Sequence, residues 1–211
     1  WKKGERTYEI FSQSLKDEAV KPTKEVTRTF QCSNLNLTIA LRMFFGPILA
    51  ACLTSPALYE IAIGVNAESP EWEALIKATL KYGEDRIIAG DYKNYDQRKS
   101  SQISMADMWI QIELAKLAGY EQEWVDIMTT LAAEVMYPVI YMNGDLFKLL
   151  NTTPSGHSLT TFMNCIDGAI YLRMAYYALA MMQRLNKIPL YHQVSALSTY
   201  GDDNFQSVRR N

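Results

Sequence analysis

The sequence predicts an α+β fold, in which helices pack against antiparallel strands. Apolar residues recur at helical spacing in several long segments, and short apolar runs end in polar turns. No repeat divides the 211 residues, which are 48% hydrophobic and 21% charged. This composition is typical of a globular protein and not of a disordered one.

The first half of the chain contains one polar segment and two predicted helices. The lysine-rich stretch up to about residue 30 is expected to be extended or loop-like. Helical periodicity runs over residues 37–51 and is expected to break near Gly46-Pro47, because proline disrupts a helix interior. A second helix has Ser69 as its N-cap, Pro70 in its first turn and Gly83 as its stop.

Three longer helices are predicted from apolar residues that recur every three to four positions. They cover residues 103–117, 122–136 and 160–185. Gly119 closes the first of them, and Pro138 limits the second.

Strands are predicted in three places. Residues 86–90 are an apolar run that indicates a buried strand, with a polar exit at Asp91. Asn143-Gly144 suits the type I′ turn of a hairpin over residues 139–149. The last hairpin joins strands 194–200 and 204–208 through a turn at Gly201-Asp202.

The cysteines and histidines argue against several classes of site, and the charges are unevenly distributed along the chain. The three cysteines are scattered and have no C-x-x-C spacing, so neither a disulfide framework nor a zinc site is indicated. Of the two histidines, His157 is expected to be a loop residue without a catalytic role. The net charge is −2, although the first thirty residues carry seven Lys or Arg against five acids. The longest apolar run, from Met43 to Leu53, is too short to span a bilayer, so we expect a soluble protein without a transmembrane segment.

Three aspartates form the most informative constellation. Asp91 follows a predicted strand, whereas Asp202 and Asp203 lie in a tight turn that Gly201 makes possible. Magnesium prefers carboxylate oxygens and phosphates. Two such ions about 3.5–4 Å apart can activate an attacking hydroxyl and stabilise a leaving pyrophosphate. Each piece alone is more often a solvated turn or a strand exit, so their order along the chain decides the interpretation.

The spacing of these residues follows a recognisable pattern of four motifs. An Asp-x4-Asp pattern comes first, a glycine loop that leads into a helix comes second, and Tyr-Gly-Asp-Asp comes last. In this order they resemble motifs A, B and C of the palm domain of positive-strand RNA virus polymerases, particularly the picornavirus-like group. A basic element near the N-terminus resembles motif F of the same family. The motifs are Lys16-Asp17-Glu18 with Thr27-Arg28, Asp91–Asp96, Ser155–Asn164 and Tyr200–Asp203.

The resemblance implies a polymerase palm, with an antiparallel sheet and packed helices, plus part of the fingers. It assigns residues 1–85 to the fingers, 86–98 to the palm strand with motif A, 99–150 to a fingers insertion and 151–211 to the palm with motifs B and C. We expect the chain to be a catalytic-core fragment in which the thumb is absent, as is the lysine of motif D.

The resemblance also implies the roles of individual residues. Asp91 and Asp202 would bind two Mg²⁺ ions, with Mn²⁺ as an alternative, and Asp203 would assist. A second group would form the nucleotide-binding site. Some of its members would sense the ribose 2′-hydroxyl, Gly156 would let the motif B loop flex, and the basic residues would line the triphosphate path. Its members are Asp96, Ser155, Gly156, Thr160 and Asn164 around the sugar, and Lys16, Lys24 and Arg28 along the triphosphate.

The expected partners are an RNA template, a primer or product strand and ribonucleoside triphosphates, with a viral genome-linked protein as a further candidate primer. The expected location is the host cytoplasm, at membrane-associated replication complexes. Two alternatives stay open: a reverse transcriptase, and an inactive palm that serves as an RNA-binding or assembly module. Asp96 and the motif B loop argue against the first, and the three intact aspartates argue against the second.

Overall fold

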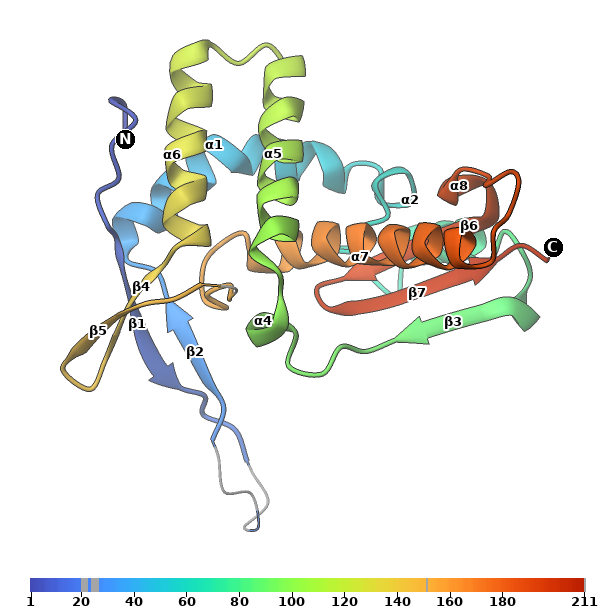
Figure 1. Ribbon diagram of the computed structural model, residues 1–211, viewed down its shortest axis with the longest axis horizontal. Helices are drawn as coiled ribbons and strands as arrows, with labels where there is room; N and C mark the ends of the chain where they lie inside the picture. The colour runs from blue at the N-terminus through green and yellow to red at the C-terminus, as the bar shows by residue number, and fades with distance from the viewer. Residues whose placement is uncertain (20–22, 24–26, 151, 211) are drawn as a thin grey trace. The chain divides into compact units, whose positions relative to one another are not determined.

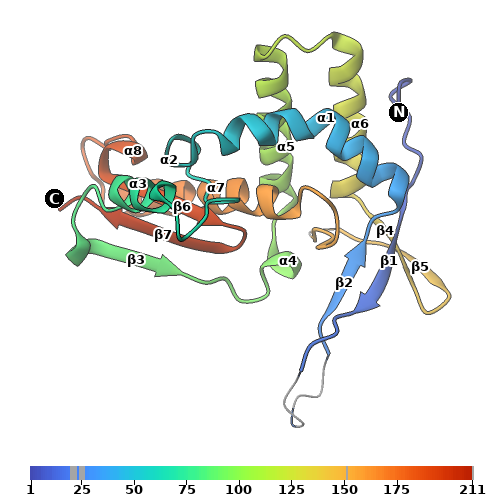
Figure 2. The same cartoon turned by 180° about the vertical axis from the view of Figure 1, so that it is seen from behind.

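A computed structural model describes residues 1–19, 23, 27–150 and 152–210 (Figures 1 and 2). The chain forms two compact units. Unit 1 comprises Trp1–Ile48 and Asn94–Thr160, and unit 2 comprises Leu49–Lys93 and Thr161–Asn211. Each unit contains one sheet with helices of its own, which confirms the α+β class. The predicted division into fingers and palm segments stays a prediction.

The sheet of unit 1 has four strands in the order β2-β1-β4-β5. β1 pairs antiparallel with β2 and parallel with β4, so the N-terminal stretch that was predicted to be extended or loop-like contains two paired strands. The hairpin of β4 and β5 turns at Asn143 and Gly144, whose φ angles of 52° and 96° confirm the predicted type I′ turn. The strands are β1 Ile10–Leu15, β2 Thr29–Cys32, β4 Val139–Met142 and β5 Asp145–Lys148.

Two helices described in unit 1 agree closely with predicted ones, and a short helix at Tyr95–Arg98 was not predicted. Ser100 caps α5 by accepting a hydrogen bond from the Gln102 backbone at 3.3 Å. α5 and α6 lie side by side as an antiparallel pair (Figure 1). These helices are α4 Tyr95–Arg98, α5 Ser101–Leu117 and α6 Gln122–Met136.

Helix α1, Leu35–Leu53, continues through Pro47, so the predicted interruption was wrong. Leu37, Leu41 and Phe45 recur every four residues along α1 and are all fully buried. Burial of three large side chains outweighs the roughly 3 kcal/mol that an interior proline costs. By length and composition alone α1 could also cross a bilayer, a test that core helices of soluble proteins pass as well.

The sheet of unit 2 is antiparallel and has the order β3-β7-β6. Its strands are β3 Ile87–Gly90, β6 Ser195–Tyr200 and β7 Asp203–Val208. The predicted buried strand is in fact an edge strand, in which Ile87 is 41% and Ile88 48% exposed. An apolar run predicts a strand but does not show whether one neighbour or two will flank it.

Two helices of unit 2 cover opposite faces of this sheet (Figures 1 and 2). α3, Pro70–Thr79, is capped by Ser69 as predicted, but it ends before Gly83, which precedes the 3-10 turn η1 at Glu84–Arg86. α7, Thr160–Met182, packs its N-terminal half into a buried cluster with the end of α1. The short helices are α2 Pro56–Tyr59 and α8 Tyr191–Val194.

Candidate active site

The three aspartates predicted to bind metal lie at one end of the unit 2 sheet. Asp91 follows Gly90, which pairs with Asn204 of β7. Asp203 is the neighbour of Asn204 and opens β7, and Asp202 lies in the turn before it. The end of β3 and the β6–β7 turn therefore point the same way (Figure 1), and all three aspartates are exposed.

The turn that carries Asp202 is held in place by a contact with α7. Gly201 has a φ of 61° whereas Asp202 has no positive φ, the pattern of a type II′ turn. The Gly201 N–H donates to the Cys165 Sγ at 3.1 Å, and Cys165 is fully buried. Cys165 therefore positions the turn. Sequence reasoning missed this role, although its place directly after Asn164 was a usable signal.

Asn204 was also missed. Its side-chain Nδ2 donates to the Gly90 carbonyl at 3.0 Å, and the residue is only 9% exposed. This bond fixes the backbone immediately before Asp91. The available signal was a polar residue at a strand position directly after Asp202-Asp203.

The chemistry of these residues fits a divalent metal ion. Carboxylate oxygens are the ligands that Mg²⁺ prefers, and exposed side chains can adjust their rotamers to an ion. Among residues 1–19, 23, 27–150 and 152–210, no three His, Cys, Asp or Glu side chains lie close enough together to hold an ion in this structure. The fit rests on donor type and on placement at one sheet end.

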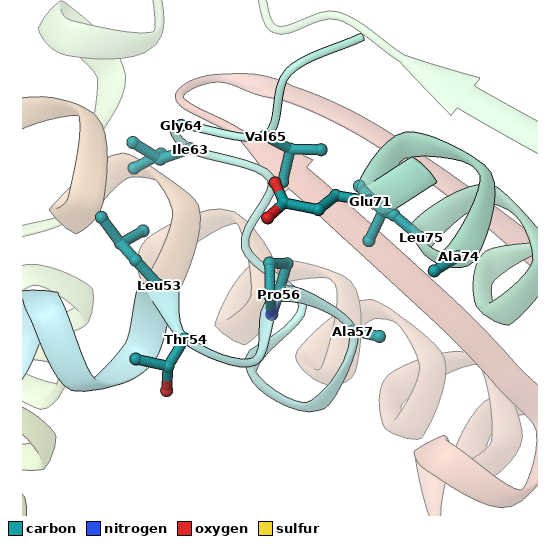
Figure 3. A pocket seen from close by; sticks show the side chains of 10 residues that line it. All are labelled: Leu53, Thr54, Pro56, Ala57, Ile63, Gly64, Val65, Glu71, Ala74 and Leu75. Carbon is teal, nitrogen blue, oxygen red and sulfur yellow. The ribbon is translucent and has the colours of Figure 1, made fainter. Parts of the chain in front are cut away.

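Cavities lie near this sheet in the described part of unit 2. One, of about 480 Å³, runs between α3 and the β6–β7 hairpin and is lined in part by Asp203 and Asn204. Another, of about 420 Å³, lies between the end of α1, α2 and α3 (Figure 3). Its walls are mainly apolar, with the Glu71 side chain at one side, and it contains none of the predicted site residues. Of these two cavities, the first borders the candidate site.

The motif B loop of unit 1 is tied to strand β2. The Gly156 N–H donates to the Gln31 carbonyl at 2.8 Å, and the Ser33 N–H donates to the Gly156 carbonyl at 3.2 Å. A Cβ added at Gly156 would lie 2.4 Å from the Gln31 oxygen. Close backbone approach thus gives Gly156 a reason to lack a side chain, besides the predicted flexing of the loop, which stays a prediction.

Ser155, Thr160 and Asp96 also lie in unit 1. The Thr160 hydroxyl is 3.0 Å from the His157 carbonyl, so it closes the loop on itself. The backbone carbonyl of Asp96 accepts hydrogen bonds from Thr152 Oγ1 at 3.1 Å and from Thr153 N at 3.2 Å. Asn164 belongs to α7 in unit 2, and its predicted pairing with Asp96 stays a prediction.

His157 is a buried loop residue, 7% exposed, whose Nδ1 accepts the Leu159 N–H at 3.2 Å. Burial, together with the nearby Lys99 charge, lowers the pKa of His157 to about 3. The imidazole is therefore neutral near pH 7, and Nε2 carries the proton. Sequence reasoning treated His157 as an ordinary loop residue and did not anticipate this burial.

Two of the predicted triphosphate residues, Lys16 and Arg28, lie at the far end of the β1–β2 pair. The Lys16 N–H donates to the Arg28 carbonyl at 2.9 Å, which brings the two residues side by side. The Arg28 guanidinium is 62% exposed and lies 3.4 Å from the Glu18 carboxylate. Lys24 falls outside the described residues.

The whole chain, residues 1–211, matches the family described as viral RNA-dependent RNA polymerase. The chain belongs to this family. The predicted resemblance is thereby confirmed, and related proteins of picorna-like viruses agree. This polymerase chain is 28% identical over 210 residues to the replicase polyprotein of Drosophila C virus (strain EB), covering 94% of the chain and 12% of that protein. It is 27% identical over 219 residues to the genome polyprotein of Deformed wing virus, covering 100% and 7%.

A solved structure shares the fold of this polymerase chain. A Sicinivirus 3Dpol RNA dependent RNA polymerase superposes with a TM-score of 0.78 at 20% identity, over 97% of this chain and 41% of that one. This polymerase chain thus spans a small part of its polyprotein relatives and less than half of the solved polymerase.

Proposed function

We propose that this chain is the catalytic core of an enzyme that synthesises RNA on an RNA template during viral genome replication. The 3′-hydroxyl of a primer attacks the α-phosphate of a ribonucleoside triphosphate. A phosphodiester bond forms, the bond to the β-phosphate breaks, and pyrophosphate leaves. The observation that carries the proposal is the presence of Asp91, Asp202 and Asp203 at one sheet end of a chain that belongs to the polymerase family.

Polymerases of this family use divalent metal ions in general. Asp91 and Asp202 would hold two Mg²⁺ ions, or Mn²⁺ in their place, and Asp203 would assist. Bound there, the ions would lower the pKa of the attacking hydroxyl and neutralise charge on the leaving pyrophosphate. The contribution of the chain is rigid placement: β3 and β7 pair up to Gly90 and Asn204, so the acids project from a fixed edge.

The nucleotide would be recognised by residues of the motif B loop and its neighbours. A ribose 2′-hydroxyl both donates and accepts, so the Asp96 carboxylate and the Asn164 amide can each contact it, helped by Ser155 and Thr160. The hydrogen bonds that join the Asp96 backbone to Thr152 and Thr153 support a common site, because they connect motif A to the start of that loop.

The triphosphate would run along the basic end of the β1–β2 pair. Lys16 and Arg28 lie side by side there, and Lys24 would complete the set. The exposed guanidinium of Arg28 suits bidentate contact with phosphate oxygens. The partners would be an RNA template, a primer or product strand and nucleotides, with a genome-linked viral protein as an initiating primer. The site of action would be replication complexes on host cytoplasmic membranes.

The test is primer extension by the full-length polymerase with RNA template, ribonucleotides and Mg²⁺. Asp202→Asn keeps the size of the side chain but removes the charge, so kcat should fall at least about a hundredfold. Asp145→Asn is the matched control, because Asp145 is an exposed aspartate beside another two-residue hairpin turn. The melting temperature should be unchanged in both variants.

Three results would contradict the proposal. Wild-type elongation by Asp202→Asn would refute the metal-binding role. RNA binding without extension by the unmodified enzyme would favour the inactive module, and extension on RNA with deoxyribonucleotides alone would favour a reverse transcriptase.

A further inference from the structure

A buried carboxylate in unit 1 holds the N-terminal segment. Glu134 of α6 has no exposed surface. Its Oε1 accepts the backbone N–H groups of Thr7 at 2.8 Å and Tyr8 at 3.1 Å. Its Oε2 accepts the Glu9 N–H at 3.2 Å and the Arg6 Nη2 at 3.0 Å. One side chain thus binds four groups from four consecutive residues.

The local backbone is shaped for this contact. Tyr8 has a φ of 56°, which turns its N–H and those of its neighbours toward one point, as in the anion-binding nests of other proteins. Arg6 also donates to the Tyr137 carbonyl at 2.9 Å and lies over the Tyr8 ring. Hydrogen bonds to an ionised acceptor are stronger than neutral ones, and removing that acceptor leaves several donors unpaired.

Strand β1 starts where this contact ends. Ile10, the next residue after Glu9, pairs with Val139 of β4. β1 then pairs with β2 as far as Leu15 and Thr29, and the next step along the pair is the Lys16–Arg28 hydrogen bond. A paired strand is a stiff element, so the anchored end fixes the position of the basic end.

The same strands reach the motif B loop. β2 ends at Cys32, which forms a parallel bridge with Gly156. A displacement of β1 would therefore be transmitted through β2 both to Arg28 and to the loop. No residue of this path other than Lys16, Arg28 and Gly156 belongs to the site described above.

We propose that Glu134 is a positioning residue for the incoming nucleotide. Its carboxylate fixes the start of β1, and the β1–β2 pair carries that position to Lys16 and Arg28, which contact the triphosphate. The inference rests on the proposed function. It predicts that loss of the carboxylate weakens nucleotide binding more than it slows the chemical step.

The experiment measures steady-state primer extension by the full-length polymerase over a range of ribonucleotide concentrations. Glu134→Ala should raise the KM for nucleotide about tenfold and change kcat less than about threefold, because the substitution displaces groups that bind the triphosphate and leaves the aspartates in place. Glu134→Gln, which keeps the shape and one acceptor oxygen, should give a smaller rise. Glu123→Gln is the matched control on the same helix, since Glu123 pairs with Lys2 at the exposed surface and should leave both constants unchanged.

A purely structural role would give another result. Partial unfolding lowers the amount of active enzyme and hence the apparent kcat, but it leaves KM unchanged. Hydrogen exchange at the Lys16 amide, which donates to the Arg28 carbonyl, should be faster in Glu134→Ala if β1 loses its anchor. If Glu134→Ala fails to fold, Arg6→Met serves as the test variant. It removes one of the four hydrogen-bond donors to the Glu134 carboxylate and leaves the three backbone donors, so it should raise the KM for nucleotide about threefold.

An unchanged KM in the folded Glu134 variant, or in Arg6→Met where that variant decides, would overturn the inference whatever the exchange rates show. If the unmodified enzyme does not extend primers at all, the proposed function fails instead, so the two failures are distinguishable.

Discussion

The side-chain amide of Asn204 donates a hydrogen bond to the backbone carbonyl of Gly90 across the β3–β7 pair, at 3.0 Å. The contact depends on the absence of a side chain at Gly90, since a Cβ there would lie 3.0 Å from both terminal atoms of the Asn204 amide. Asp91 follows immediately. The two strands are thus locked together one residue before the first predicted metal ligand.

Asn204→Ala should therefore impair catalysis more than stability. The loss of one hydrogen bond costs about 1 kcal/mol of unfolding free energy. A small misplacement of Asp91 should lower kcat about tenfold or more, because positioning errors of about 1 Å are costly. Val208→Ala is the control, since Val208 lies on the same face of β7 at its other end. Primer extension at the normal rate by Asn204→Ala would show that the backbone of Asp91 needs no such bond.

Gly156→Ala should destabilise the protein by about 2 kcal/mol or more, because the new methyl group meets the Gln31 carbonyl at 2.4 Å. Gly46→Ala is a matched control: Gly46 lies inside α1 with no atom within 4 Å of an added Cβ, so alanine there should stabilise by up to about 1 kcal/mol. Urea unfolding measures both. Equal stability of Gly156→Ala and the unmodified protein would mean that the loop readily leaves β2, as the predicted flexing requires.

The buried His157 makes stability depend on pH. In the folded protein its pKa is about 3, whereas the ordinary value is 6.5. Between these values the unfolded chain binds a proton that the folded chain does not. The contribution of the neutral His157 to the unfolding free energy is therefore fully present above pH 6.5. It is lost as pH falls below that value, by about 1.4 kcal/mol per pH unit.

Unfolding free energies measured between pH 7 and pH 5 test this dependence. His157→Asn keeps an acceptor for the Leu159 N–H but cannot titrate, so the slope should become shallower by about 1 kcal/mol per unit. His192→Asn changes the other histidine, at an exposed position of α8, and should retain the steep slope. A slope that is the same in His157→Asn would show that the imidazole is not held neutral by the fold.

Local signals predicted much of the fold. The Ser69 cap and the Asn143-Gly144 turn fix backbone geometry through their own atoms, so they could be identified without tertiary information. Strands β1 and β2 could not, because β1 is held in part by β4, more than a hundred residues away. The exposure of β3 likewise depends on which strands flank it, and the sequence does not encode that locally.

In the candidate site, too, some residues could be identified from the sequence and others could not. Asp91, Asp202 and Asp203 were identifiable because their order and spacing match a family pattern, and the strand register places them together. Asn204 and Cys165 act through hydrogen bonds to the backbone of a distant strand or turn. Their roles depend on pairing that only coordinates reveal.

Asp96 provides the remaining test, of sugar selectivity. The structure ties its backbone to the start of the motif B loop through Thr152 and Thr153, and its side chain is half-buried. A buried acceptor that loses its partner is costly, so a site built around the ribose hydroxyl rejects a deoxyribonucleotide. Asp96→Ala removes that acceptor, and the preference for ribonucleotides, measured as the ratio of kcat/KM values, should fall about tenfold or more.

Gln97→Ala is the matched control for Asp96→Ala, because Gln97 is the next residue of α4 and is exposed. It should keep the full preference. A general loss of activity in Asp96→Ala would lower kcat/KM for both sugars and leave their ratio unchanged. The ratio therefore separates sugar recognition from damage to the fold, and an unaltered ratio in an active Asp96→Ala enzyme would remove this residue from the sugar-sensing site.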